Sequence, residues 1–401
     1  MRNLYIILVF ISTSALGQIT VTTVTPTFNG SGGVTIDSTG QVYIGDFGDF
    51  LGGPDTDGIP NNVMKLDKDL NLTIVADDFT GASGNEFNSE GILFQADIRD
   101  NAVYKIVDGA RELYASEGLV LPVGIAFDAE DNLYVCNCGA NNIRKITPEG
   151  VSTMFFAGNG LLGCPNGMTI DENGNLYVVN FSNPFIVKIE PDGTASNIGN
   201  TAAGNGHIDY DLNTNHLYIA SFGAHLIYYL DLDDLDEGAR IIAGTGVPGN
   251  DDGEALSATF SAPNGIAVTK NGDSLYVNSS ATLNNANLNP QYVRVLSNVL
   301  ETLSNDNGTT DVEDVADNIY KTYPNPTTDT FTIESNLSIR TDGLMIRVWD
   351  VNGNTVQSIN KFNSAQTSKI IIDTSLFPTG VYFYSVKSKE GKLKHGKILK
   401  K

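Results

Sequence analysis

A strand-opening motif that recurs six times constrains the fold of this chain more than any other feature. In four copies a glycine opens an alternating strand, an aliphatic residue follows nine positions later, and an Asp or Asn follows thirteen positions later. The fifth and sixth copies keep the same order of residues with looser spacing. The opening glycines are Gly33, Gly84, Gly124, Gly167, Gly206 and Gly265.

Each copy continues into two more alternating strands. In the stretch from Gly139 to Gly158, for example, the strand from Ile143 to Ile146 is followed by a Pro-Glu-Gly turn and a fourth strand. Four strands per unit and a period of about 40 residues predict propeller blades. One blade cannot bury both of its faces, whereas a closed ring of blades buries each face against a neighbour. We therefore predict an all-β fold, a six-bladed β-propeller followed by a small Ig-like β-sandwich.

The N-terminus predicts export. Arg2 precedes the apolar run from Leu4 to Ile11, and small residues follow at Ala15 and Gly17. This apolar run is too short to span a bilayer, so residues 1–17 are expected to be a signal peptide that is cleaved before Gln18. The mature chain is then expected to be soluble or attached to a surface in an oxidising compartment.

The charge of the chain is distributed over two modules. Residues 1–298 contain 12 Lys and Arg against 35 Asp and Glu, a net charge of −23, whereas residues 299–401 contain 12 of each sign. Binding to nucleic acid or to an anionic membrane needs clustered Lys and Arg, which an acidic module lacks. The expected modules are the propeller at 18–298, a polar linker at 299–320 and a second domain at 321–401.

The repeats resemble a known group of propellers. The run from Ala243 to Val268, the openings PVGIAFD and PNGMTID and the LYV strands are similar to NHL-repeat propellers and to gluconolactonase and regucalcin-type propellers, over residues 28 to 298. The resemblance implies the fold but not one function, because the same blade serves enzymes, receptors and binding modules.

Two sets of polar residues are expected to share one rim of the channel, because the first strand of a blade begins where the second strand ends. They could bind a ligand, but Asn before Gly is also common in turns, and Asp or Asn after a strand can tie the next loop. The candidates before an opening glycine are Asn166, Asn205 and Asn264, and those at the end of a second strand are Asp46, Asp97, Asn137 and Asn180.

The resemblance also implies a metal. Gluconolactonase-like propellers hold a divalent cation with Asn, Asp and Glu side chains at blade openings, which makes Ca²⁺ a candidate channel cofactor and Asn166, Asn205 and Asn264 its candidate ligands. Glu90 falls in the hairpin turn after Gly84, at the opposite end of the barrel, so the metal-binding role of the family Glu is not assigned to it.

Histidine and cysteine supply further candidates. His207 and His225 lie near the predicted channel mouth, where a His could act as a general base, or they could be ordinary rim or core residues. Cys138 and Cys164 fall on the same rim of neighbouring blades, so they could form a disulfide or remain buried thiols.

The second domain resembles, over its whole length, the C-terminal sorting domain of the type IX secretion system of Bacteroidota. The YPNP start, the VWDVNGNTV hairpin with its turn at Asn352 and Gly353, the PTGVYFYSV strand and the Lys-rich end occur in that order in 321–401. The resemblance implies Sec export, passage across the outer membrane by the type IX machinery, and secretion or attachment at the cell surface. An accessory Ig-like or carbohydrate-binding sandwich is the alternative.

The sequence therefore predicts a secreted, monomeric propeller that binds a small molecule, a glycan or a peptide at one rim of its channel and makes no contact with nucleic acid. The alternative is a metal-dependent hydrolase of the lactonase type, or a propeller lyase, in which a metal polarises a carbonyl and a base activates water.

Overall fold

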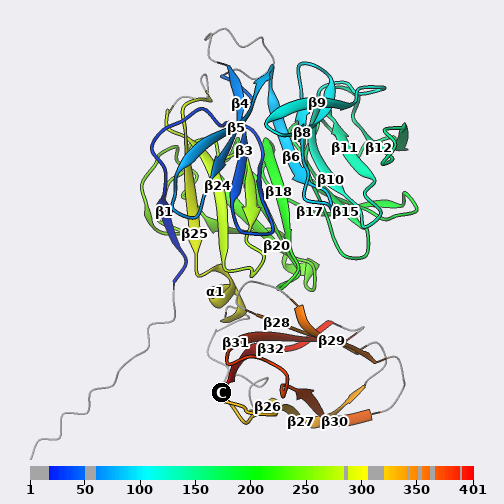
Figure 1. The fold of residues 1–401 in the computed structure, drawn as a ribbon, viewed down its shortest axis with the longest axis vertical. Coiled ribbons are helices and arrows are strands. Elements are labelled where there is room, and N and C mark those ends of the chain that lie inside the picture. Colours follow the sequence, from blue (N-terminus) through cyan, green and yellow to red (C-terminus); the bar gives the residue numbers. More distant parts are fainter. Residues whose placement is uncertain are drawn as a thin grey trace, which may run out of the picture.

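In the computed structural model the chain forms two β-rich parts, one of which lies above the other in Figure 1. The structure describes residues 18–49, 60–283, 288–305, 320–340, 344–350, 355–361, 366–388 and 391–401. The expected signal peptide, residues 306–319 of the expected linker and the predicted turn at Asn352 and Gly353 lie outside these residues.

The predicted propeller is confirmed by six sheets that follow one another along the chain. Blade 1 consists of β2 (Val34–Ile36), β3 (Val42–Gly45), β4 (Asn61–Leu66) and β5 (Leu72–Phe79). Blade 2 consists of β6 (Ala82–Phe87), β7 (Leu93–Asp97), β8 (Ala102–Val107) and β9 (Ala110–Ala115). Blade 3 consists of β10 (Pro122–Phe127), β11 (Leu133–Asn137), β12 (Asn142–Ile146) and β13 (Ser152–Phe156). Blade 4 consists of β14 (Pro165–Ile170), β15 (Leu176–Asn180), β16 (Phe185–Ile189) and β17 (Ala195–Asn200). Blade 5 consists of β18 (Asn205–Asp211), β19 (His216–Ser221), β20 (Leu226–Asp231) and β21 (Arg240–Ala243).

The sixth blade closes the ring with a strand from the other end of the propeller. Its sheet has β23 (Ile266–Val268), β24 (Ser274–Ser280) and β25 (Gln291–Ser297), and β1 (Thr20–Thr23) pairs with β25 as the fourth strand, followed by β22 (Gly253–Glu254). Asp252 accepts hydrogen bonds from the backbone nitrogen of Thr23 at 2.8 Å and from the buried Arg294 at 2.7 Å. The first strand of the mature chain is thus tied to the last blade.

Apolar packing occurs between blades rather than within them. Each of the six junctions between neighbouring blades contains one cluster of buried apolar side chains. At the junction of blades 3 and 4, for example, Cys136 and Ile143 pack with Leu176 and Val178. Alternation along each strand sends side chains to both faces of the blade, so every blade is buried on two sides.

The first strands approach one another closely at the channel axis. A Cβ atom added at Gly84 would lie 2.4 Å from the carbonyl oxygen of Val123 and 2.9 Å from Gly124 Cα. Similar contacts with the backbone of the following blade occur at Gly33, Gly124 and Gly167. Glycine is therefore required here for close approach of backbones.

The fifth blade departs from the sequence prediction. We call the place where each first strand comes closest to the next blade the ring position. Gly206 was expected there in blade 5, but a Cβ added at Gly167 of blade 4 would lie 2.6 Å from the Cα of His207. Pairing agrees, because Asn205 pairs with Ser221 just as Pro165 pairs with Asn180 in blade 4. His207 thus replaces the ring glycine, which leaves the predicted register of this blade wrong by one residue.

A longer hairpin explains this shift. In blade 4, Ile170 pairs with Leu176, whereas in blade 5 Tyr210 pairs with Leu217, one residue further along. Asp211 holds this longer turn by accepting hydrogen bonds from Asn213 and Thr214.

The chain leaves the propeller through a helix. Helix α1 (Val299–Asn305) falls in the segment expected as a linker, and its Val299 and Leu303 are buried against the last blade. No helix among the described residues is long and apolar enough to cross a membrane.

The C-terminal part is a sandwich of two antiparallel sheets, as predicted. One sheet has the order β26-β27-β30 and the other β29-β28-β31-β32. Phe331, Val348 and Tyr384 belong to the apolar core. The strands are β26 (Tyr320–Tyr323), β27 (Thr330–Arg340), β28 (Leu344–Asp350), β29 (Thr355–Lys361), β30 (Gln366–Asp373), β31 (Gly380–Ser388) and β32 (Gly391–Lys400).

Candidate functional site

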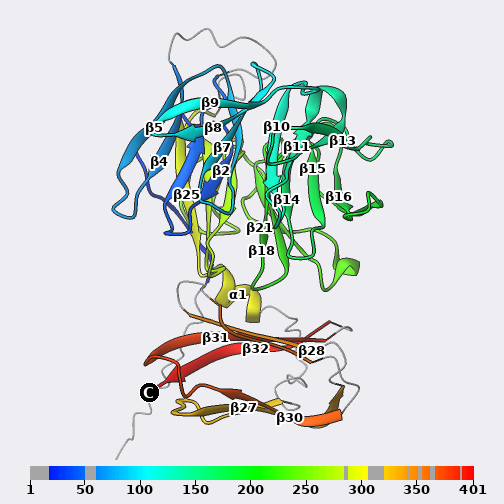
Figure 2. The same cartoon turned by 45° about the vertical axis from the view of Figure 1, so that its right-hand side comes forward.

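Two places in the propeller carry the residues singled out by the sequence. The rim face is the end of the ring where first strands begin and second strands end, and it carries the loops between blades. The channel waist is the space between the first strands, from the ring position to two residues past it. Figure 2 shows the blades around this axis, with the sandwich on the side of α1, away from the rim face.

The residues that end the second strands are fully buried and hydrogen-bonded within the protein. The carboxylate of Asp97 accepts a bond from the backbone nitrogen of Thr80 at 2.8 Å, and Asn180 Oδ1 accepts one from Gly163 at 2.8 Å. Asn137 makes the equivalent bond to Val120, and Asp46 accepts bonds from Gly48 and Asn289. These side chains tie the loops of the rim to the strands, so we assign Asp46, Asp97, Asn137 and Asn180 a structural role.

The residues before the ring position act as links between blades. Asn166 Nδ2 donates to the carbonyl oxygen of Asn205 in the next blade at 2.8 Å, and Asn264 Nδ2 donates to that of Ser31 at 2.6 Å. Ser83 Oγ makes the same link to Pro122 at 3.0 Å. Alternate junctions of the ring are therefore joined by a side chain.

Asn205 is not equivalent to the other two Asn residues. The shifted register of blade 5 places it where Pro165 lies in blade 4. It is fully buried, its Oδ1 accepts a bond from Thr201 at 2.9 Å, and its Nδ2 donates to Asn180 at 3.2 Å.

The described residues do not fit a metal at the rim. Such a site needs several oxygen ligands from blade openings. Among the described residues, only Asn166 and Asn264 supply an amide at these openings, which is far fewer oxygen ligands than Ca²⁺ takes, and their nitrogens are bound to the neighbouring blade. Among the described residues, no group of three His, Cys, Asp or Glu side chains is arranged to hold a metal ion.

His225 and the two cysteines stabilise rim loops. His225 Nδ1 accepts a hydrogen bond from the backbone nitrogen of Ala262 at 3.0 Å, and burial lowers the pKa of His225. An imidazole that accepts this bond is neutral and holds its loop rather than acting as a base. Cys138 and Cys164 form a disulfide that joins the rim loops of blades 3 and 4.

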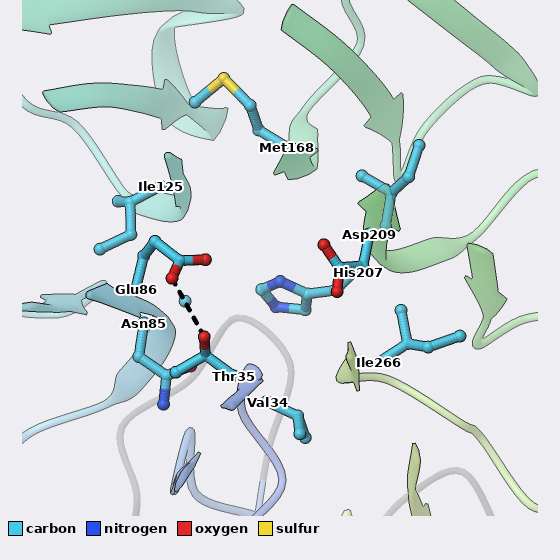
Figure 3. Close-up of a pocket in the computed structure, with 11 residues that line it drawn as sticks. Val34, Thr35, Asn85, Glu86, Ile125, Met168, His207, Asp209 and Ile266 are labelled. Carbon is cyan, nitrogen blue, oxygen red and sulfur yellow. Dashed lines mark hydrogen bonds between the residues drawn. The ribbon is translucent and has the colours of Figure 1, made fainter. Parts of the chain in front are cut away.

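The channel waist encloses a cavity of about 20 Å³ (Figure 3). Glu86 approaches it from blade 2 and Asp209 from blade 5, the opposite side of the ring, while the imidazole of His207 projects between them. This ring contacts the far side of the channel, because its Cε1 is 3.2 Å from a Cβ added at Gly33. The ring glycines leave the room that the imidazole fills, so His207 blocks the channel.

The two acids are held in similar ways. Glu86 Oε1 accepts bonds from Thr35 at 3.1 Å and from the backbone nitrogen of Phe87 at 2.8 Å. Asp209 Oδ1 accepts bonds from Thr169 at 3.3 Å and from the backbone nitrogen of Tyr210 at 2.8 Å, and its Oδ2 accepts one more from the backbone nitrogen of Val268 at 2.8 Å. Each acid thus bonds to a Thr of the preceding blade, and the arrangement recurs across the ring.

The electrostatics of the waist disfavour charge. Burial and the nearby charge of Asp209 raise the pKa of Glu86 to about 7, and burial raises the pKa of Asp209 to about 6. Burial also lowers the pKa of His207 to about 4. At neutral pH the imidazole is therefore uncharged and does not neutralise the acids.

Sequence reasoning missed Glu86 and Asp209. Its rim candidates were only the residue before each opening glycine and the residue thirteen positions after it. Glu86 lies two residues after the ring position at Gly84, and Asp209 two residues after that at His207. Correct alignment of blade 5 would have shown acids at the same position of opposite blades.

Replacing Glu86 with Gln should stabilise the protein at high pH. A carboxyl group whose pKa is raised on folding destabilises the folded state when it is ionised. This destabilisation is absent below about pH 4.5, grows as pH rises, and reaches its full value above about pH 7. We expect Glu86→Gln to exceed wild type by about 1–2 kcal/mol at pH 8, allowing for partial exposure, and by less at pH 5. Urea unfolding at the two pH values measures this, and a less stable variant at pH 8 would contradict the raised pKa of Glu86.

Apolar side chains also occur on the rim face. Phe222 and Leu288 are buried in a small cluster there, with Phe47 and Phe181 packed against it. The rings of Phe181 and Phe222 are 6.1 Å apart. Four further large apolar side chains of rim loops are at least 42% exposed: Val120, Leu121, Val247 and Leu283.

Three family models match parts of the chain. Residues 321–401 match the secretion system C-terminal sorting domain, residues 3–157 the SMP-30/gluconolactonase/LRE-like region, and residues 156–317 the Teneurin NHL domain. Among curated proteins, none matches the sequence.

Solved structures agree on the fold. A protein of unknown function from Bacteroides thetaiotaomicron VPI-5482 is 15% identical, with a TM-score of 0.53. Auxiliary nutrient binding proteins from Bacteroides ovatus ATCC 8483 and B. thetaiotaomicron VPI-5482 are 14% and 12% identical, with TM-scores of 0.54 and 0.55. In all three cases the match covers 70% of this chain and 76% of the other. The chain is therefore a six-bladed propeller similar to the gluconolactonase-like and NHL families, followed by a type IX secretion C-terminal sorting domain.

Proposed function

We propose that the propeller is an extracellular binding module that holds an extended polypeptide on its rim face. The sorting domain indicates export by the type IX secretion system to the cell surface or beyond. There the propeller would meet ligands from outside the cell. The names of two similar structures, auxiliary nutrient binding proteins, agree with a binding role.

The observation that carries the proposal is the exposed apolar set on the rim loops. Leu283 and Val247 are 63% and 61% exposed, and Val120 and Leu121 are 45% and 42% exposed. Single exposed apolar residues are ordinary, and these four come from separate loops, so the ligand that would contact several of them is an extended one that crosses the rim face. Binding on the rim face needs no passage through the channel, which His207 blocks.

The composition of this face favours a polypeptide. Its exposed large apolar residues are Val and Leu, with Phe181 partly buried beside them, and the only Trp of the chain, Trp349, lies in the sandwich. Aliphatic and aromatic contacts rimmed by polar groups are typical of protein interfaces. The acidic propeller would favour a neutral or basic ligand. The waist cavity of about 20 Å³ is too small for an organic ligand.

The connection to the sorting domain leaves the rim face accessible. Strand β25 runs away from the rim, since Gln291 pairs with Ser280 near the rim and Ser297 pairs with Ser274 at the other end. Helix α1 follows at that opposite end, and both views place the sandwich there (Figures 1 and 2). The sorting domain and the proposed binding site would therefore lie on opposite sides of the propeller.

The hydrolase alternative has less support. It needs a metal at the rim and a base beside it. Asn166 and Asn264 link blades, and His225 holds a loop. We therefore derive no reaction for the rim.

The test is binding of the mature protein to a library of immobilised 15-residue peptides of varied charge. We expect micromolar binding to neutral or basic peptides with apolar residues. Leu121→Asp combined with Val247→Asp should weaken binding at least tenfold, because charge at an apolar contact is costly to desolvate. Both positions are exposed, so the fold should tolerate the change.

The matched control is Leu113→Asp combined with Val151→Asp. These residues are 61% and 57% exposed and lie outside the rim loops, so the added charge is the same. Equal loss of binding in both double variants, or no binding to any peptide, would overturn the proposal.

A further inference from the structure

We propose that the propeller and the sorting domain form a salt-sensitive closed contact, in which acidic turns of blades 4 and 5 cover the sheet face that carries Arg347 and Trp349. While the contact is closed, this face of the sorting domain is hidden from any other partner. When the contact opens, an aromatic surface beside a guanidinium group becomes accessible. The inference does not depend on a rim ligand, because the contact lies at the end of the propeller opposite to the rim face.

The first observation is the direction in which this sheet face points. In the sheet β29-β28-β31-β32, Val348 belongs to the core of the sandwich, so alternation along β28 places Arg347 and Trp349 on the outer face. Ser385 of β31 lies on the same face, opposite Arg347. Both views show this sheet on the side of the sandwich that is nearest to the propeller (Figures 1 and 2).

The second observation is that this outer face is buried. Trp349 is 2% exposed and Ser385 is 6% exposed, whereas the outer face of a sheet that is turned to solvent leaves its side chains open. On the other sheet of the sandwich, for comparison, the outward side chain of Ile371 is 60% exposed. The ring of Phe383 stacks against Trp349 at 6.2 Å within the sheet and covers only one edge of the indole. The face is therefore covered on the side of the propeller.

The acidic turns lie at the same end of the propeller as the sandwich. First strands begin at the rim face, so the turns that follow β14 and β18 lie at the opposite end. Glu172 is exposed in the turn after β14, and Asp211 ends β18. Burial lowers the pKa of Arg347, whereas Glu172 and Asp211 raise it. The charges of these propeller turns therefore act on a guanidinium group of the sorting domain.

Net charge favours the closed contact. Residues 321–401 contain 12 Lys and Arg against 6 Asp and Glu, a net charge of +6, whereas residues 1–298 carry −23. Complementary charge of this kind orients two surfaces and holds them together most strongly when little salt is present. The contact should therefore weaken as ionic strength rises.

The closed contact leaves two hydrogen-bond donors unsatisfied. Arg347 Nη1 and Trp349 Nε1 are buried and have no hydrogen-bond partner among the described residues. Arg347 Nε donates to Thr355 Oγ1 at 2.8 Å, and the guanidinium carbon lies 5.5 Å from the centre of the Trp349 ring. Buried donors without acceptors disfavour the closed state, and water would satisfy both after opening. These unsatisfied donors make the contact reversible rather than permanent.

The experiment uses the mature full-length chain, in which Trp349 is the only Trp and so reports on the contact alone. Quenching of its fluorescence by acrylamide, which is uncharged, measures how accessible the indole is. We expect weak quenching at low salt. In 1 M NaCl, where the screening length is about 3 Å, quenching should rise by about twofold or more.

Charge variants test the contact from both sides. Glu172→Arg changes an exposed turn of the propeller, cannot disturb the packing inside the sandwich, and should raise quenching of Trp349 about twofold at low salt. Arg347→Glu should have the same effect, and its combination with Glu172→Arg should return quenching towards the wild-type value, because the attraction is restored with the charges exchanged. The matched control is Lys369→Glu, which reverses a charge on the other sheet of the sandwich and should leave quenching unchanged.

Two results would overturn the proposal. One is equal quenching of Trp349 in wild type at low and high salt. The other is quenching that Glu172→Arg leaves unchanged, since the propeller turn would then not cover the sheet face.

Discussion

Replacing Gly124 with Ala should prevent the ring from closing properly. The added Cβ would lie 2.6 Å from the carbonyl oxygen of Asn166 and 2.9 Å from the backbone nitrogen of Met168. Both atoms belong to the backbone of the next blade, so relief requires the two blades to move apart. We expect a loss of roughly 3 kcal/mol or more in the free energy of unfolding, measured by urea titration.

Gly199→Ala in β17 is the matched control. Its added Cβ would meet only side-chain carbons of Leu230 and Ile186, at 3.3 Å or more. These carbons can shift, so we expect a change within about 1 kcal/mol. Similar losses for the two variants would show that the blades do not depend on backbone contact at the ring.

Loss of the disulfide should have the second largest effect. Cys138 and Cys164 are 26 residues apart, and a cross-link of that span restricts the unfolded chain by about 3 kcal/mol. The double variant Cys138→Ser, Cys164→Ser should therefore unfold at lower temperature than wild type. Reducing agent should lower the Tm of wild type and leave the double variant unchanged.

Cys136→Ala is the control for this prediction. Cys136 is a buried free thiol next to the disulfide in sequence. The variant should keep the full response to reducing agent. A wild-type protein whose Tm is insensitive to reducing agent would contradict the predicted contribution of the disulfide.

Most of the fold could be predicted because its determinants are local and repeated. Spacing from a ring glycine to an aliphatic residue fixes a hairpin, and the same spacing recurs in blades 1 to 4. The pairing of β1 with β25 could not be predicted in this way, since it joins Thr20 to Ser297 through no repeated pattern. Helix α1 was missed because it is short and its buried apolar residues, Val299 and Leu303, pack on the last blade rather than forming a recognisable helical pattern.

The fifth blade shows why one anchor residue is insufficient. Gly206 was chosen as the opening residue, yet His207 takes the ring position of blade 5, with its side chain projecting into the channel. His207 does so because the glycines of the other blades leave space at the axis. The better signals were Ile208, which follows the aliphatic pattern, and Asp209, which aligns with Glu86.

The candidate site was predicted only in part. The rim positions predicted from the sequence included Asn166 and Asn264, whose amides link neighbouring blades. This role could not be predicted, because the acceptors are backbone carbonyl oxygens of the next blade, and the sequence does not show where those lie. Glu86 and Asp209 were missed because they come from opposite blades, so residues that line the same cavity are far apart in the sequence. The apolar rim set has no motif at all, since Leu121 and Val247 come from separate loops.

Hydrogen–deuterium exchange with and without a bound library peptide locates the binding face. We expect slower exchange in the rim loops at 116–121, 157–164 and 244–252, and unchanged exchange in the turns at 128–132 and 147–151 on the opposite face. Protection confined to those turns, or to the sandwich strands, would contradict a binding site on the rim face.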